Sequence, residues 1–110
     1  MENHEKMKML MIVCRDSLED EVLNLLKLSG ISCGYSIISK VTGCGEAGTV
    51  DGLGYFTGLG FDTMILVVIE QKDFDRVVAS IRSFHLRLMQ TQEGRSIPLK
   101  VFAQACEIVV

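Results

Sequence analysis

The chain has 110 residues, which is the length of a single domain that can enclose a hydrophobic core. Hydrophobic residues make up 48% of the chain and aromatic residues 6%, so the core must consist mainly of Leu, Ile, Val and Met. The net charge is −3 with Lys and Arg spread along the chain, which argues against a nucleic-acid-binding surface.

The N-terminal stretch MENHEKMK is polar and has no apolar core of signal-peptide length. The longest uncharged apolar run, TMILVVI at 63–69, is too short to cross a membrane. We therefore expect a soluble, cytoplasmic protein that does not insert into a membrane. The cysteines form no C-x-x-C pair, so we expect reduced thiols and no metal site, with a redox role for Cys44 left open. These cysteines are Cys14, Cys33, Cys44 and Cys106.

The first half of the chain predicts a strand, a helix and a second strand. Residues 6–14, KMKMLMIVC, begin with alternating residues and end apolar on both faces, as in a buried strand. A helix follows over 17–29, where Asp16 or Ser17 can cap its start and Gly30 can end it as the C′ residue. The apolar run within 35–41 predicts the second strand.

A glycine-rich stretch then follows over 42–60 and holds seven of the ten glycines. Its start, GCGEAG, reads G-x-G-x-x-G, but the residues after Gly48 will not form the helix that a dinucleotide-binding fold requires. A P-loop is excluded because the lysine is missing. We expect a long functional loop, since its apolar and aromatic residues are unlike those of a disordered spacer.

The second half predicts another strand over 62–70, a helix over 73–89 and a closing strand region over 98–109. The helix has its apolar residues at helical spacing, which places them on one inner face. Its arginines are interpreted as a solvated face and its histidine as a rim residue. These residues are Arg76, Arg82, Arg87 and His85.

The element order βαββαβ predicts an α+β, ferredoxin-like sandwich, in which an antiparallel sheet carries both helices on one face. The other face of such a sheet is normally polar. Here the strands 6–14 and 62–70 are apolar on both sides, so a monomer would expose a large apolar face. We therefore expect an oligomer, with Met7, Met9 and Met11 packing at its centre rather than binding a soft metal.

This arrangement resembles the PII signalling superfamily over about residues 6–102. The best local match is KVTGCGEAG at 40–48, which is similar to the base of the T-loop, the regulatory loop of that family. The resemblance implies one PII-like domain over 1–110, assembled as a homotrimer. The loop 42–60 would act on a partner protein, such as a membrane transporter or an enzyme.

The resemblance also implies a small anionic effector, with an adenine nucleotide (ADP, ATP or AMP) as the candidate, bound in clefts between subunits. No cofactor is implied. Glycine backbone at the T-loop base would approach the phosphates, with a threonine hydroxyl and cations nearby. The ligand-binding residues implied in this way are Lys40, Thr42, Gly43, Gly45, Gly48, Arg95 and Lys100.

The chain departs from the family pattern where Ala47 replaces the glutamine that engages metal–ATP and 2-oxoglutarate. We therefore expect binding that depends little on magnesium or 2-oxoglutarate. Two alternatives stay open. One is a CutA-like metal-responsive trimer, although the only imidazoles, His4 and His85, lie far apart in sequence. The other is a small ferredoxin-like enzyme, although no convincing nucleophile–base pair occurs, so we expect no enzymatic activity.

Overall fold

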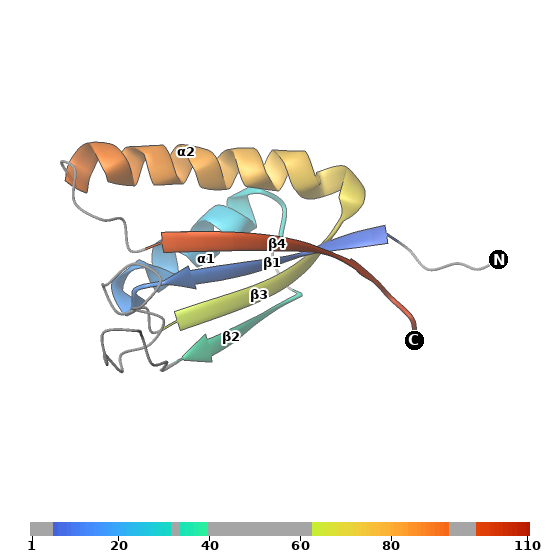
Figure 1. The fold of residues 1–110 in the computed structure, drawn as a ribbon. Helices are drawn as coiled ribbons and strands as arrows, with labels where there is room; N and C mark the ends of the chain where they lie inside the picture. Colours follow the sequence, from blue (N-terminus) through green and yellow to red (C-terminus); the bar gives the residue numbers. More distant parts are fainter. Residues whose placement is uncertain (1–5, 32–33, 40–62, 93–98) are drawn as a thin grey trace, which may run out of the picture.

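The computed structural model describes residues 6–31, 34–39, 63–92 and 99–110, which form one antiparallel sheet with two helices on one side (Figure 1). The strands are β1 (Lys6–Cys14), β2 (Tyr35–Ser39), β3 (Thr63–Glu70) and β4 (Leu99–Glu107). Their order across the sheet is β2-β3-β1-β4, and every neighbouring pair is antiparallel. This topology confirms the predicted ferredoxin-like α+β fold.

Both helices begin with a short 3-10 turn. The turn η1 (Asp16–Leu18) leads into α1 (Glu19–Leu28), and η3 (Gln71–Asp73) leads into α2 (Phe74–Gln92). The prediction that Asp16 or Ser17 caps the first helix was wrong, because no side chain makes a capping hydrogen bond there. The tight turn replaces the cap, since the Leu18 N–H donates to the Arg15 carbonyl at 2.8 Å.

The end of α1 follows the sequence prediction. Gly30 has a φ of 96°, a conformation that side chains with a Cβ disfavour. The Ile31 N–H donates to the Leu26 carbonyl at 2.8 Å, and the Gly30 N–H donates to the Lys27 carbonyl at 3.0 Å. These two bonds form a Schellman motif with Gly30 at C′.

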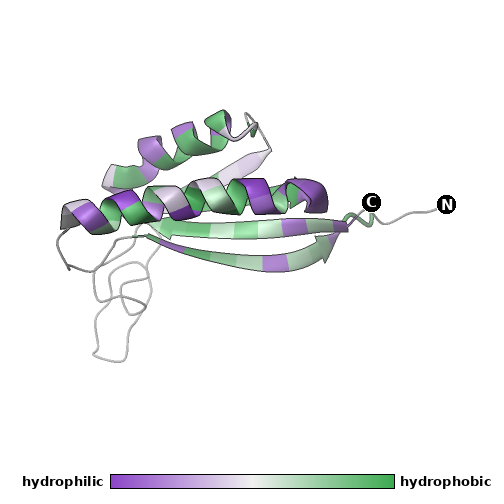
Figure 2. Ribbon diagram, turned by 90° about the horizontal axis from the view of Figure 1, so that it is seen from above, coloured by the Kyte–Doolittle hydropathy of each residue, from purple (hydrophilic) through white to green (hydrophobic). Residues whose placement is uncertain are grey.

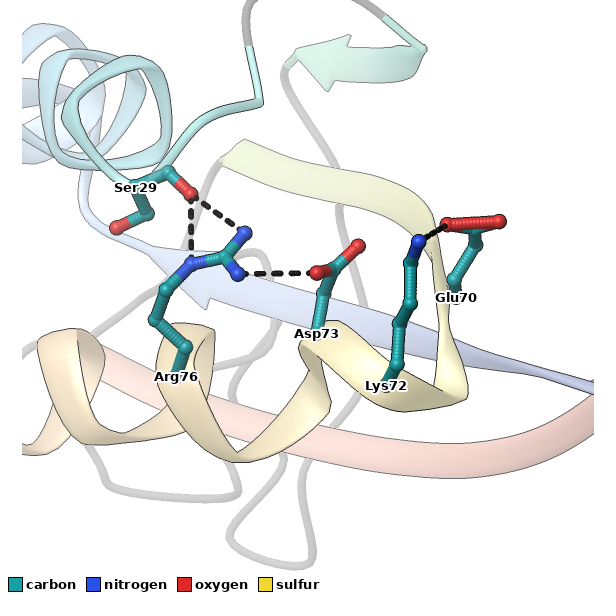
Figure 3. A network of polar contacts seen from close by, with 5 residues as sticks. All are labelled: Ser29, Glu70, Lys72, Asp73 and Arg76. Atoms are coloured by element: carbon teal, nitrogen blue, oxygen red, sulfur yellow. Dashed lines mark hydrogen bonds and ion pairs between the residues drawn. The ribbon is translucent and has the colours of Figure 1, made fainter.

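Arg76 joins the end of α1 to the start of α2 (Figure 3). Its Nε and Nη2 donate to the Ser29 carbonyl at 3.3 and 3.1 Å, and its Nη1 donates to Asp73 Oδ1 at 2.9 Å. The side chain is exposed, as predicted, but it is held rather than freely solvated. The guanidinium supplies donors to a helix C-terminus, where carbonyl groups lack partners within the helix.

The core lies between the sheet and the helices. Alternate residues of β1 point into it, and Leu10, Ile12 and Cys14 are almost fully buried. The predicted inner faces of both helices are confirmed by their burial against the same cluster. The buried helix residues are Leu18, Val22, Leu26, Val77, Ile81 and Phe84. The last helix continues to Gln92, beyond its predicted end at residue 89.

The other side of the sheet carries no described helix, and we call it the second face. The register places Met9 opposite Val68, and it places Met11 between Leu66 and Phe102. Val68 and Phe102 are 42% and 43% exposed. Green, apolar residues predominate along the strands beside α2 in Figure 2, whereas green and purple alternate along the helices. A large apolar face of this kind is typical of an interface.

No described helix has the length and hydropathy that a membrane-spanning helix requires.

Candidate functional site

One end of the sheet gathers the segments that the sequence singles out. The register aligns Ser39 with Thr63, Thr63 with Cys14, and Cys14 with Leu99, in one row across all four strands. The ends of β1 and β2 and the starts of β3 and β4 therefore lie together, at the left of Figure 1. The segments 40–62 and 93–98, which carry all but one of the predicted ligand residues, attach to this end of the sheet.

Most of the predicted ligand residues lie outside the described part of the chain. These are Lys40, Thr42, Gly43, Gly45, Gly48 and Arg95, and the same holds for the whole predicted loop 42–60. Lys100 is described, and it is an exposed residue near the start of β4, opposite Val13 of β1. Its predicted neighbour Arg95 precedes the strand by a few residues.

The row extends across the width of the sheet. Its outer members, Ser39 on β2 and Leu99 on β4, belong to the two edge strands. Three strand spacings separate these edges, which is about 14 Å. A ligand that contacts backbone next to Ser39 and side chains next to Leu99 must therefore bridge the sheet or lie between two subunits.

Carboxylates occupy the middle of this end. The Thr63 hydroxyl, which is buried, lies 3.5 Å from Asp16 Oδ1 and 3.5 Å from Glu19 Oε1. A hydroxyl has one proton, so it donates to one carboxylate at a time. The contact fixes the first turn of the first helix to the start of β3, and it makes this part of the site unfavourable for an anion.

Cations gather instead at the β4 edge. Lys100 lines a cleft between α2 and β4 together with Arg82 and His85. The sequence analysis placed Arg82 on a solvated face and His85 on a rim, so their meeting with Lys100 was missed. Their spacing of three residues put both side chains on one face of the helix, but the strand that packs there could not be identified.

A second groove runs between α1 and α2. Leu25, Leu28 and Phe84 line it, and Arg87 lies over the Phe84 ring with its guanidinium carbon 5.8 Å from the ring centre. The groove is about 370 Å³ and contains Glu21 as well as Arg87. Among the described residues, no group of three or more His, Cys, Asp and Glu side chains is arranged to hold a metal ion.

These observations define a ferredoxin-like βαββαβ domain, with an apolar second face and two long-chain segments attached to one end of its sheet. The model of the family described as nitrogen regulatory protein P-II matches residues 7–107. Because this match covers nearly the whole chain, the chain belongs to the P-II family. The family consists of signalling regulators, which favours a regulatory role over the CutA-like and enzymatic alternatives.

Solved structures of PII-like proteins have the same fold. CPII from Thiomonas intermedia K12, a nitrogen regulatory PII-like protein bound to ADP, AMP and bicarbonate, matches with a TM-score of 0.65 and 17% identity, covering 98% of each chain. Its complex with ADP and bicarbonate matches at 0.65 and 19%, covering 96% of this chain and 91% of that one. A PII-like signaling protein from Thermus thermophilus matches at 0.55 and 17%, with 98% and 94% coverage. A comparison with curated proteins gave no match.

Proposed function

We propose that this protein is a PII-type regulator that binds an adenine nucleotide between the subunits of a homotrimer. The loop 42–60 would carry the response to a partner protein, through a change in order when the effector binds. A membrane transporter or an enzyme is the kind of partner we expect. The proposal names a regulator and assigns no catalytic step to any residue.

The single observation that carries this proposal is the row of paired residues at one end of the sheet. It brings the ends of segment 40–62 to directly paired residues, Ser39 and Thr63. It also brings the end of segment 93–98 to the same edge of the molecule, next to Leu99. A T-loop base and a basic second loop are both required for a PII-type nucleotide site, and these pairings are compatible with that requirement.

The second face supports the homotrimer. Its residues would be exposed to water in a single chain, and its exposed apolar side chains come from three different strands. The clearest examples are Ile38 on β2, Val68 on β3 and Phe102 on β4. Covering them in an assembly removes apolar area from water, which is the dominant favourable contribution to protein association.

The relatives support the choice of ligand. CPII has been solved with ADP and AMP, together with bicarbonate or acetate. We assign the nucleotide phosphates of this protein to the backbone of Gly43, Gly45 and Gly48 and to the Thr42 hydroxyl. Lys40, Arg95 and Lys100 supply the positive charge. A Cβ at either of the first two glycines would block close approach or a positive φ.

Calorimetric titration with ADP, AMP and ATP, with and without bicarbonate, tests the proposal. Wild type should bind at least one nucleotide, and Gly45→Val and Arg95→Ala should each weaken it by about tenfold or more. Lys27→Ala is the matched control, because Lys27 is an exposed lysine on α1, in its last turn. Equal affinity in all four proteins would place the nucleotide elsewhere, and no binding by wild type would refute the proposal.

A further inference from the structure

A cleft of about 310 Å³ runs between α2 and the β4 edge of the sheet. On the helix side it extends from Phe74 to His85, which is about 16 Å of helix. Leu99 to Ala103 of β4 form the other wall. The cleft is thus long and narrow, and its volume is at the lower end of the range for small-molecule sites.

The floor and most of the walls are apolar. Leu10, Ile81 and Leu99 form a buried floor, and each is less than 10% exposed. Phe74 and Val78 line the part of the cleft that lies toward the start of α2. The Lys8 ammonium lies 5.0 Å from the centre of the Phe74 ring, so the ring has a cation on one face.

The opposite end of the cleft is cationic. Arg82, His85 and Lys100 line it, and no Asp or Glu occurs among its described lining residues. Within the described part of the chain, none of these three side chains has a hydrogen bond or ion pair. Three unpartnered donors, two of them cations, at one end of an apolar cleft are complementary to a ligand with an anionic head and an apolar tail.

We propose that this cleft binds a linear amphipathic carboxylate, with a chain of about six to ten carbons matched to its length and volume. The carboxylate lies among Arg82, His85 and Lys100, and the alkyl chain follows the apolar floor toward Phe74. This site goes beyond the nucleotide site, from which it differs in ligand chemistry and in the helix residues that form it. An alkyl phosphate has the same combination of head and tail, and the experiment separates the two.

The test is a titration of the full chain with hexanoate, octanoate and decanoate, below their micelle-forming concentrations and without nucleotide. Each added methylene that enters the cleft should tighten binding by about fourfold, so octanoate should bind about 16-fold tighter than hexanoate. Octanol should bind at least tenfold more weakly than octanoate. Octyl phosphate binding tighter than octanoate would overturn the carboxylate assignment.

Nuclear magnetic resonance of the imidazoles locates the site. The His85 signals should shift saturably with octanoate, whereas those of His4, which does not line the described cleft, should not. Arg82→Gln should weaken octanoate by about three- to tenfold, a reduced value because the arginine is exposed. The matched control is Arg87→Gln, one turn further along α2 and outside this cleft, which should bind octanoate like wild type.

A second variant tests the apolar half. Ala103 is exposed and lines the cleft, so Ala103→Leu should fold and should shorten the space for the chain. Decanoate should then bind no tighter than hexanoate. Equal effects of Arg82→Gln and Arg87→Gln, equal shifts of both histidines, or no octanoate binding would each overturn the proposal. ADP binding by Arg82→Gln should match wild type, so failure here is distinguishable from failure of the nucleotide site.

Discussion

Replacing Phe102 with Glu should dissociate the proposed homotrimer, because it puts a carboxylate on the second face. Phe102 lies on β4 opposite Met11 and is 43% exposed in the single chain. In an assembly that covers this face, the exposed part of the ring would be removed from water. The substitution therefore removes apolar contact area and would also bury a charge.

The size of the effect follows from the exposed area. A Phe side chain has about 200 Å² of surface, and 43% of it is roughly 85 Å². At ~25 cal/mol per Å², the lost burial is about 2 kcal/mol per subunit, or about 6 kcal/mol per trimer. The trimer dissociation constant should rise by about four powers of ten, which moves the midpoint concentration about a hundredfold because dissociation into three monomers depends on concentration squared.

Sedimentation velocity over a range of protein concentrations measures this shift. The matched control is Leu86→Glu, which makes the same kind of change at a 57% exposed leucine on α2. The control should sediment like wild type, whereas Phe102→Glu should be a folded monomer at micromolar concentration. The reasoning is refuted if wild type is a stable monomer, or if both variants associate equally.

Three further predictions concern helix ends and ligand dependence. At fixed protein concentration, urea unfolding of Arg76→Ala should show a loss of about 1 kcal/mol, since the Ser29 carbonyl loses its donors, and Arg76→Lys should lose less. Gly30→Ala should also lose about 1 kcal/mol because of its positive φ, and Gly30→Asn should lose less; equal losses would contradict this. Because Ala47 replaces glutamine, magnesium and 2-oxoglutarate should change nucleotide affinity by less than about threefold in calorimetry, and strong synergy would disprove it.

Sequence patterns predicted the parts of the fold that depend on neighbours along the chain. The alternation in 6–14, the apolar stripes of both helices and Gly30 each have a local cause, namely side-chain direction or backbone conformation. The second face was also predictable, because two strands were apolar at every position. The start of the first helix was not, since Thr63 from a distant strand lies beside Asp16 and Glu19.

The cationic cleft shows why the rest was harder to predict. Arg82 and His85 share a helix face, and that much follows from their spacing. Lys100 joins them only because α2 packs along β4, a contact between elements that the sequence does not encode locally. The Arg76 contact with Ser29 has the same origin, because the two residues lie 47 positions apart. Solvated arginines and bound arginines have the same sequence pattern, and packing decides between them.

The width of the sheet connects the proposed nucleotide site to assembly. Lys40 follows β2 and Lys100 begins β4, and these strands are opposite edges about 14 Å apart. In a closed ring of three, each subunit presents one surface to its neighbour and receives a different one, so unlike edges can meet. A nucleotide that contacts both lysines is then best placed between subunits, where it binds the trimer but not the monomer.

Ligand binding and assembly must therefore be coupled. At a free concentration of about 100 times Kd, each bound nucleotide would stabilise the assembly by about 2.7 kcal/mol, and three would exceed the loss estimated for Phe102→Glu. Saturating ADP should restore the trimer in that variant. If monomeric Phe102→Glu instead binds ADP as tightly as wild type, the site lies within one subunit, and the segments 40–62 and 93–98 must reach each other across their own sheet.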